Sequence, residues 1–279
     1  MLKHGWILLC ILLLAGVVTF TVLAGQSESP TIEYITAALA HQEAASLEVT
    51  YTFSSEGKEL GKVRYVRTPG MLLRVDEGFI LYDATKRSCS YDREKLEFRS
   101  LAVKKDGGNI GRIDTILADP FRQQDMMDTA RFPLPHKDLS TEGILLEWVA
   151  SGEVSPNKED IDGHSCWRIE VADPIRAISK YIIWLDPDIG FCPRLIDFIW
   201  KDGHTGHHSF KDYTKVSNGI WFPGKLEITS VDKTEAYFLL CKVDTVRSNF
   251  QIPKDELTVK FPSGTRVSIG DSGQTFVAP

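Results

Sequence analysis

The fold is decided by one stretch of the chain, YIIWLDPDIGFCPRLIDFIW, which spans residues 181–200. It contains two apolar runs joined by a short polar segment with the sequence Asp-Pro-Asp-Ile-Gly. Pro187 fixes φ at a value that suits a turn, and Gly190 can adopt a positive φ without strain. The stretch therefore predicts a β-hairpin.

The first run of this hairpin is apolar on both of its faces. Tyr181, Ile183 and Leu185 share one face, and Ile182 and Trp184 share the other. A strand with one solvated face should alternate apolar and polar residues. We therefore expect that both faces are covered, or that one of them lines an apolar cavity.

Composition defines the broad class of the protein. The chain has 279 residues, of which 43% are hydrophobic and 25% are charged, so a globular domain with a sizeable core is expected. The formal net charge is -6, which does not favour nucleic acid or an anionic membrane as a partner.

Residues 1–24 are typical of an export signal. Lys3 is followed by a run without charged residues from Gly5 to Gly25, and short side chains precede a cleavage site after Ala24. The alternative is an inner-membrane anchor formed by residues 5–25, because about 20 apolar residues span a bilayer. Either way, residues 25–279 are expected to be exported as a single domain.

Four cysteines remain after the signal: Cys89, Cys166, Cys192 and Cys241. In an oxidising compartment they allow three disulfide pairings, and the sequence does not choose among them. Buried free thiols are equally compatible with a chain of this size.

Hydrophobic periodicity places the first elements. A helix is expected over residues 31–47, with Thr31 as its N-cap. The period then changes to two, and short strands follow from Leu47 to Leu101 in an antiparallel meander. From Asp106 the spacing of Ile110 and Ile113 predicts helix again.

This second helical region predicts an insertion at about 104–147 between two halves of a sheet. After it, strands are expected at about 148–154, 164–171, 179–186, 191–200, 205–214, 220–230, 234–247 and 257–261. The whole pattern indicates an α+β domain that is mainly β.

Two motifs resemble catalytic or metal-binding sequences. Ser272 lies in Gly-Asp-Ser-Gly and His41 follows Ala-Ala-Leu-Ala, as in serine proteases, but we expect residues around Ser272 to be a frayed terminus. His204, His207 and His208 could bind a metal, but their Gly-rich setting favours a solvated turn. We therefore expect no catalytic residues, no metal and no cofactor.

The remaining signal is apolar. Either these residues are all core, or the curved sheet leaves a groove that the inserted helices cover. Asp197 would be costly in a dry interior, so its neighbours on the opposite face should point inwards. The candidate groove residues on the strands are Trp167, Ile169, Ile196, Phe198 and Trp200. The candidate lid residues are Ile113, Leu117, Phe121, Met126 and Met127.

Three segments resemble the periplasmic outer-membrane lipoprotein carrier family and its anti-sigma regulatory relatives. The first is GKVRYVRTPGMLLR at 61–74, and the third is LTVKFPSGTRV at 257–267. The second begins with IWLDP at 183–187 and continues with the Pro-Arg pair at 193–194, the Asp-Tyr pair at 212–213 and GIWFP at 219–223. The carriers usually have Arg directly before the Pro, where this chain has Thr68, with Arg67 one position earlier. One position on a strand corresponds to the opposite face.

This resemblance implies an unclosed antiparallel β-barrel wrapped around helices. It further implies an exported, periplasmic, non-enzymatic protein that binds a lipid acyl chain or a lipoprotein in its apolar groove. The alternative is an envelope-stress regulator or interaction module on the same fold without lipid cargo. Inner- or outer-membrane envelope proteins are then the expected partners, and nucleic acid is not.

Overall fold

The structure is a computed structural model that describes residues 29–42, 46–78, 84–116, 145–172, 178–217, 219–231 and 236–279. The expected signal at 1–24 and the candidate lid residues Leu117, Phe121, Met126 and Met127 lie outside the described residues. So does most of the expected insertion at 104–147.

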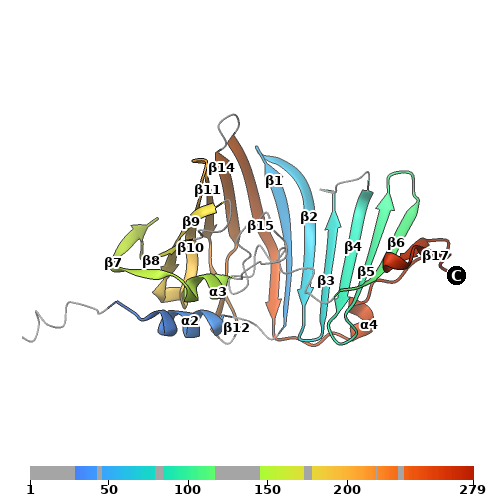
Figure 1. Ribbon diagram of the computed structural model, residues 1–279, viewed down its shortest axis with the longest axis horizontal. Helices are drawn as coiled ribbons and strands as arrows, with labels where there is room; N and C mark the ends of the chain where they lie inside the picture. The colour runs from blue at the N-terminus through green and yellow to red at the C-terminus, as the bar shows by residue number, and fades with distance from the viewer. Residues whose placement is uncertain are drawn as a thin grey trace, which may run out of the picture.

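Fifteen strands form a single curved sheet that is not closed into a barrel (Figure 1). The strand order is β17-β16-β6-β5-β4-β3-β2-β1-β15-β14-β11-β10-β9-β8-β7. The first meander comprises β1 (Leu47–Ser55), β2 (Lys58–Arg67), β3 (Met71–Glu77), β4 (Ala84–Asp92), β5 (Glu97–Lys104) and β6 (Asn109–Thr115). The second comprises β7 (Glu153–Ile161), β8 (His164–Ala172), β9 (Ile178–Asp186), β10 (Cys192–Trp200), β11 (Thr205–Lys211), β14 (Lys225–Val231) and β15 (Ala236–Ser248). This architecture confirms the predicted half-barrel.

The two meanders meet where β15 pairs with β1. β15 is 13 residues long and pairs with β14 along one edge and with β1 along the other. Its antiparallel register with β1 runs from Leu47 opposite Ser248 to Ser54 opposite Leu240. A separate small sheet of β12 (Thr214–Ser217) and β13 (Ile220–Phe222) lies beside this joint.

The predicted hairpin is confirmed as β9 and β10. A single 3-10 turn, η2 (Pro187–Ile189), joins the strands, and Gly190 ends it with φ 69°. Both faces of β9 are covered, as expected: Tyr181, Ile183 and Leu185 belong to the main core, while Ile182 and Trp184 pack in a smaller outer cluster with Cys166.

Two helices lie against the inner side of the β7–β11 half. α2 (Ile32–Ala40) is shorter than the predicted helix, but its N-cap is Thr31 as expected, because the Thr31 side chain accepts a hydrogen bond from the Tyr34 amide at 3.2 Å. α3 (Leu145–Ala150) packs on α2 and on β8. Among the described helices, none has the length and hydrophobicity needed to cross a bilayer.

The C-terminal segment covers the outer side of the first meander. Leu257, at the end of the short helix α4 (Lys254–Leu257), and Val259 pack on Val66, Met71 and Leu73. The strand expected at 257–261 is therefore wrong, since this segment packs on a sheet face instead of pairing with a strand. The chain then adds β16 (Arg266–Ile269), which is parallel to β6, and β17 (Gln274–Val277).

The helix expected from Asp106 is wrong over 109–115, because these residues form β6. Apolar residues at a spacing of three indicated a helix, but pairing with β5 and β16 overrides this weak local preference. Gly111 shows why: a Cβ there would lie 2.8 Å from the Phe261 ring, so glycine lets the C-terminal segment pack directly on the strand. Ile113 is therefore a strand residue, not part of a helical lid.

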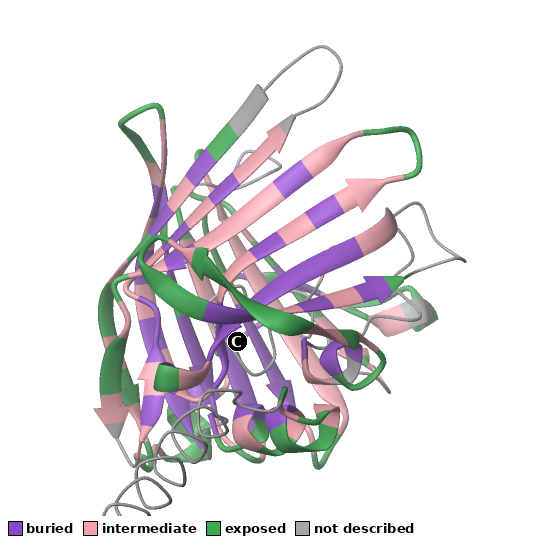
Figure 2. Cartoon of the chain, turned by 90° about the vertical axis from the view of Figure 1, so that its left-hand side faces the viewer, coloured by how far each residue is buried: buried purple, intermediate pink, exposed green. Residues whose placement is uncertain are grey.

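Buried residues follow the strands around the inside of the curve, whereas several hairpin turns are exposed (Figure 2). All four cysteines after the expected signal are buried thiols, so none of the three disulfide pairings occurs. Burial, the largest effect, raises the pKa of the Cys166 thiol to about 12. The fold is thus held by packing and sheet hydrogen bonds without covalent cross-links among these cysteines.

We predict that Gly190→Ala destabilises the protein more than a matched glycine substitution. The new Cβ would lie 2.1 Å from Nε2 of Gln42, whose Oε1 accepts a hydrogen bond from the Trp221 amide at 2.8 Å. Gly57 has a similar φ of 78° but open space around it, so Gly57→Ala should cost only the left-handed strain, about 1 kcal/mol. Urea unfolding should show that Gly190→Ala costs at least about 1 kcal/mol more. Equal losses for the two variants would contradict the contact with Gln42.

Candidate functional site: the concave face of the sheet

The candidate groove residues on the β7–β11 half do come together, but as packed core. Trp167, Ile169, Ile196 and Phe198 are at most 4% exposed. Trp200 is partly buried and packs against the same cluster. The prediction that Ile196 and Phe198 point inwards is confirmed.

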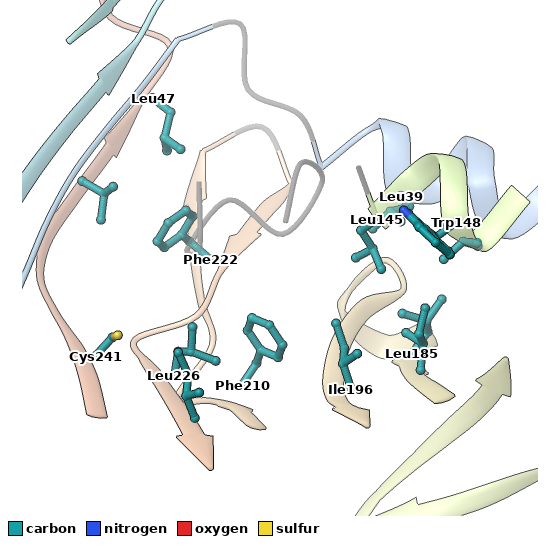
Figure 3. Close-up of a cluster of buried hydrophobic side chains, with 14 of the residues drawn as sticks. Leu39, Leu47, Leu145, Trp148, Leu185, Ile196, Phe210, Phe222, Leu226 and Cys241 are labelled. Atoms are coloured by element: carbon teal, nitrogen blue, oxygen red, sulfur yellow. The ribbon is translucent and has the colours of Figure 1, made fainter. Parts of the chain in front are cut away.

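Helix α3 covers this part of the concave face. Figure 3 shows Leu145 and Trp148 pointing towards Ile196 and Leu185. The Trp148 ring lies edge-on to Tyr181 with 4.5 Å between the ring centroids. These side chains fill the inner side of the β7–β11 half.

The β1–β5 half presents a second apolar surface. Tyr51, Phe53, Tyr65 and Tyr91 are all buried and belong to the main core, and Phe98 is partly buried beside them. Neither α2 nor α3 lies over β3 to β6 (Figure 1). Ile113 is not part of this surface, because it pairs with Arg99 and Ile269 on the outer side of the sheet, where Arg99 stacks over Phe261.

Arg67 lies on the concave face. It is opposite Leu47 on β1 and Leu72 on β3, which both belong to the main core, and it is only 3% exposed. Thr68, the residue directly before the Pro, lies beyond the end of β2, where its hydroxyl accepts a hydrogen bond from the Met71 amide at 3.1 Å. Arg67 is therefore the residue of this pair that faces the inside of the half-barrel.

Arg74 is a second cation on the concave face. It is opposite Tyr65 on β2 and Cys89 on β4, and its Nε lies 2.7 Å from Oδ1 of Asp76. Burial disfavours its charge, but Tyr51 and Asp76 outweigh this effect, so the pKa of Arg74 is raised. The guanidinium therefore stays charged next to aromatic rings.

A polar cavity of 190 Å³ lies where the β7–β8 turn meets β10 and the end of β11. It is lined by Ile161, Asp162, His164, Arg194, Phe210, Lys211 and Asp212. Nε of Arg194 lies 2.9 Å and Nη2 2.8 Å from Oδ2 of Asp186, which is 1% exposed. Nζ of Lys211 lies 2.8 Å from Oε2 of Glu227. Both cations are paired within the protein, and the cavity lies at the polar end of the hairpin.

The histidines expected in a solvated turn are placed differently. His204 ends the turn, but His207 and His208 are neighbours on β11 and so point to opposite faces. His207 pairs with Asp197 at 2.7 Å, and His208 lies against Phe198 with 4.5 Å between ring centroids. In the part of the chain that the structure describes, His, Cys, Asp and Glu side chains form no group that could hold a metal.

Ser272 and His41 do not form a catalytic pair. Ser272 lies in η3 (Gly270–Ser272), the turn between β16 and β17, and its hydroxyl donates a hydrogen bond to the Ile269 carbonyl at 2.7 Å. His41 ends α2, at the other end of the molecule (Figure 1). The expected frayed terminus is wrong, because this segment forms the last hairpin of the sheet.

Comparisons with known proteins show a shared fold at low sequence identity. No family model and no curated protein matches the chain. The crystal structure of a DUF1329 family protein from Desulfovibrio piger is 13% identical with a TM-score of 0.50, covering 81% of this chain and 95% of that one. A putative outer membrane lipoprotein-sorting protein domain from Vibrio parahaemolyticus is 12% identical with a TM-score of 0.45, covering 81% and 95%.

A LolA superfamily protein from Nitrosomonas europaea is 11% identical with a TM-score of 0.44, covering 83% of this chain and 99% of that one. The names of these two neighbours refer to lipoprotein sorting and to the LolA superfamily. At these identities the agreement concerns the fold.

We predict that His208 makes the protein less stable in acid. Burial, and then the charge of His207, lower the pKa of His208 from 6.5 to about 3. A depressed folded-state pKa means that stability is fully present above pH 6.5 and is lost as the pH falls towards 3. Stability should therefore fall by about 3 kcal/mol between pH 7 and pH 4 from this group.

Chemical unfolding at several pH values checks this. His208→Gln should flatten the acid limb of the stability profile, whereas His41→Gln at the exposed end of α2 should leave it unchanged. An unaltered acid limb in His208→Gln would show that the imidazole is hydrated in the folded protein.

Proposed function

We propose that this protein binds a lipid acyl chain or a lipoprotein on the concave face of its half-barrel. The observation that supports this most directly is the aromatic surface on the concave side of β1 to β5, where Tyr51, Tyr65 and Tyr91 are buried and Phe98 is partly exposed. The helices that fill the other half of the curve do not lie over β3 to β6 (Figure 1). A curved apolar surface of this kind is suited to an extended hydrocarbon chain.

We further propose that the protein acts after export, in the periplasm, and that it is a binding protein and not an enzyme. The charge-free run at residues 5–25 supports export. The likeness to the DUF1329 protein concerns the half-barrel fold alone. The alternative is an envelope-stress regulator or interaction module that has kept the fold without lipid cargo.

The groove is tested by Phe98→Asp, which places a charge on the proposed acyl surface. Phe98 is partly buried and opposite Tyr91, so Asp there should weaken binding of a fluorescent fatty acid by about tenfold or more. The matched control is Phe238→Asp on β15, next to the inward-facing Leu239, because Phe238 is 39% exposed and lies on the outer side. Fluorescence titration measures both affinities.

An equal effect of Phe98→Asp and Phe238→Asp would indicate non-specific adsorption of the probe. If the parent protein binds no fatty acid, the acyl-chain proposal fails and the interaction module becomes the better hypothesis.

The predicted lid has its own test. Phe121→Asp and Met127→Asp should reduce fatty-acid binding while changing the melting temperature little, because a lid over a cavity is less tightly packed than a core. If these residues are core, the same substitutions should lower the stability by about 2 kcal/mol or more, as burial of an unpaired charge does. Parallel thermal unfolding and fluorescence titration separate the two outcomes.

A further inference from the structure

Charge is unevenly distributed over the concave face of the first meander. The register of the strands places residues in three cross-strand rows on this face. The first row is Leu47, Arg67, Leu72, Tyr91, Phe98 and Asp114. The second is Val49, Tyr65, Arg74, Cys89, Ser100, Arg112 and Ser268. The third is Tyr51, Val63, Asp76, Arg87, Ala102, Ile110 and Arg266. On this face β1 contributes only apolar residues, whereas β2, β3, β4, β6 and β16 contribute one arginine each.

Arginine outnumbers carboxylate on this face. The three rows contain five arginines, at 67, 74, 87, 112 and 266, but only two aspartates, at 76 and 114. Arg74 is paired with Asp76 at 2.7 Å and Arg112 with Asp114 at 2.5 Å. Within the described part of the chain, neither Arg87 nor Arg266 forms an ion pair, and both are exposed.

The outer side of the same strands differs. There Arg64 is paired with Glu48 at 2.7 Å, Lys86 with Glu77 at 2.6 Å, and Arg99 with Glu97 at 2.8 Å. Since the protein has a net charge of -6, an excess of arginine on one face is not a consequence of composition. It indicates that an anion is attracted to the concave face.

Arg87 and Arg112 can reach one ligand group. They lie on β4 and β6, with β5 between them, and in neighbouring rows, so their backbones are about 12 Å apart at the usual strand spacing and rise. Ser100 lies on β5 between the two strands, opposite Arg112 and Cys89. Guanidinium groups suit phosphate because they present several donors in a fixed plane. Tyr91 and Phe98 lie in the first row, next to the row that contains Arg112 and Ser100.

We propose, resting on the acyl-chain binding proposed above, that the ligand is an amphiphile with an anionic headgroup. Its acyl chain lies along the aromatic surface near β1 to β5, and its phosphate contacts Arg87 and Arg112, with Ser100 as a third donor. The net charge of the protein disfavours anions in general, whereas this face selects an anion that also has a hydrocarbon chain. The protein then distinguishes acyl lipids by their headgroups.

The test compares two fluorescent lipids with identical acyl chains, phosphatidylglycerol and diacylglycerol, which lacks the phosphate; both are titrated into the full-length protein at low salt. We expect the protein to bind phosphatidylglycerol about tenfold more tightly, as one charge-assisted contact to phosphate would give. Arg87→Gln and Arg112→Gln should each remove most of this preference and leave binding of diacylglycerol, which has no phosphate to contact, unchanged. Both side chains are exposed, so the variants are expected to fold.

Arg64→Gln, on the outer side, is the matched control and should keep the preference. Equal affinities for the two lipids, or an equal loss in Arg64→Gln, would overturn this inference while leaving acyl-chain binding intact. Displacement of phosphatidylglycerol by excess inorganic phosphate would also overturn it, because a free anion would then be the ligand. If neither lipid nor a fatty acid binds, the proposed function itself fails.

Discussion

The ladder between β1 and β15 is the interaction on which the rest of the structure depends. It joins residues about two hundred positions apart, such as Leu47 and Ser248, and turns two meanders into one sheet. Because side chains alternate along a strand, this register determines which residues of both halves face the inside of the curve. A shift by one residue would move Val49 and Tyr51 out of the core and Glu48 into it. The irregularity between Thr50 and Tyr51 is accommodated without that inversion.

Local chemistry allowed part of this fold to be predicted. The Pro187 and Gly190 turn, the Thr31 cap and the inward direction of Phe198 each depend on residues that lie close together in sequence. β6 could not be predicted in this way, because its strand conformation depends on β5 and on the distant β16. The same applies to the C-terminal segment, where Leu257 finds its partners on β2 and β3.

The candidate site was predictable only in its apolar part. Aromatic and aliphatic residues at strand spacing indicated a covered surface, but not which half of the sheet the helices would occupy. The arginine-rich region was missed, although the alternation of Tyr65, Arg67, Leu72 and Arg74 was visible around the Thr-Pro-Gly turn. The net charge of the chain does not reveal this region, because carboxylates on the outer side of the sheet offset the arginines in the sum. The face of the sheet that each charged side chain occupies is known only once the register of four or more strands is known.

The four buried thiols affect how the chain responds to an oxidising environment. A thiol reacts as its thiolate, and burial raises the pKa of Cys89, Cys166 and Cys241. In the folded protein these groups are therefore slow to exchange with external disulfides, whereas an unfolded chain would expose all of them. Chain folding and cysteine oxidation thus compete during the lifetime of the unfolded state. Packing therefore protects the thiols of the native sheet from oxidation. An oxidised thiol would show that the chain had unfolded around it.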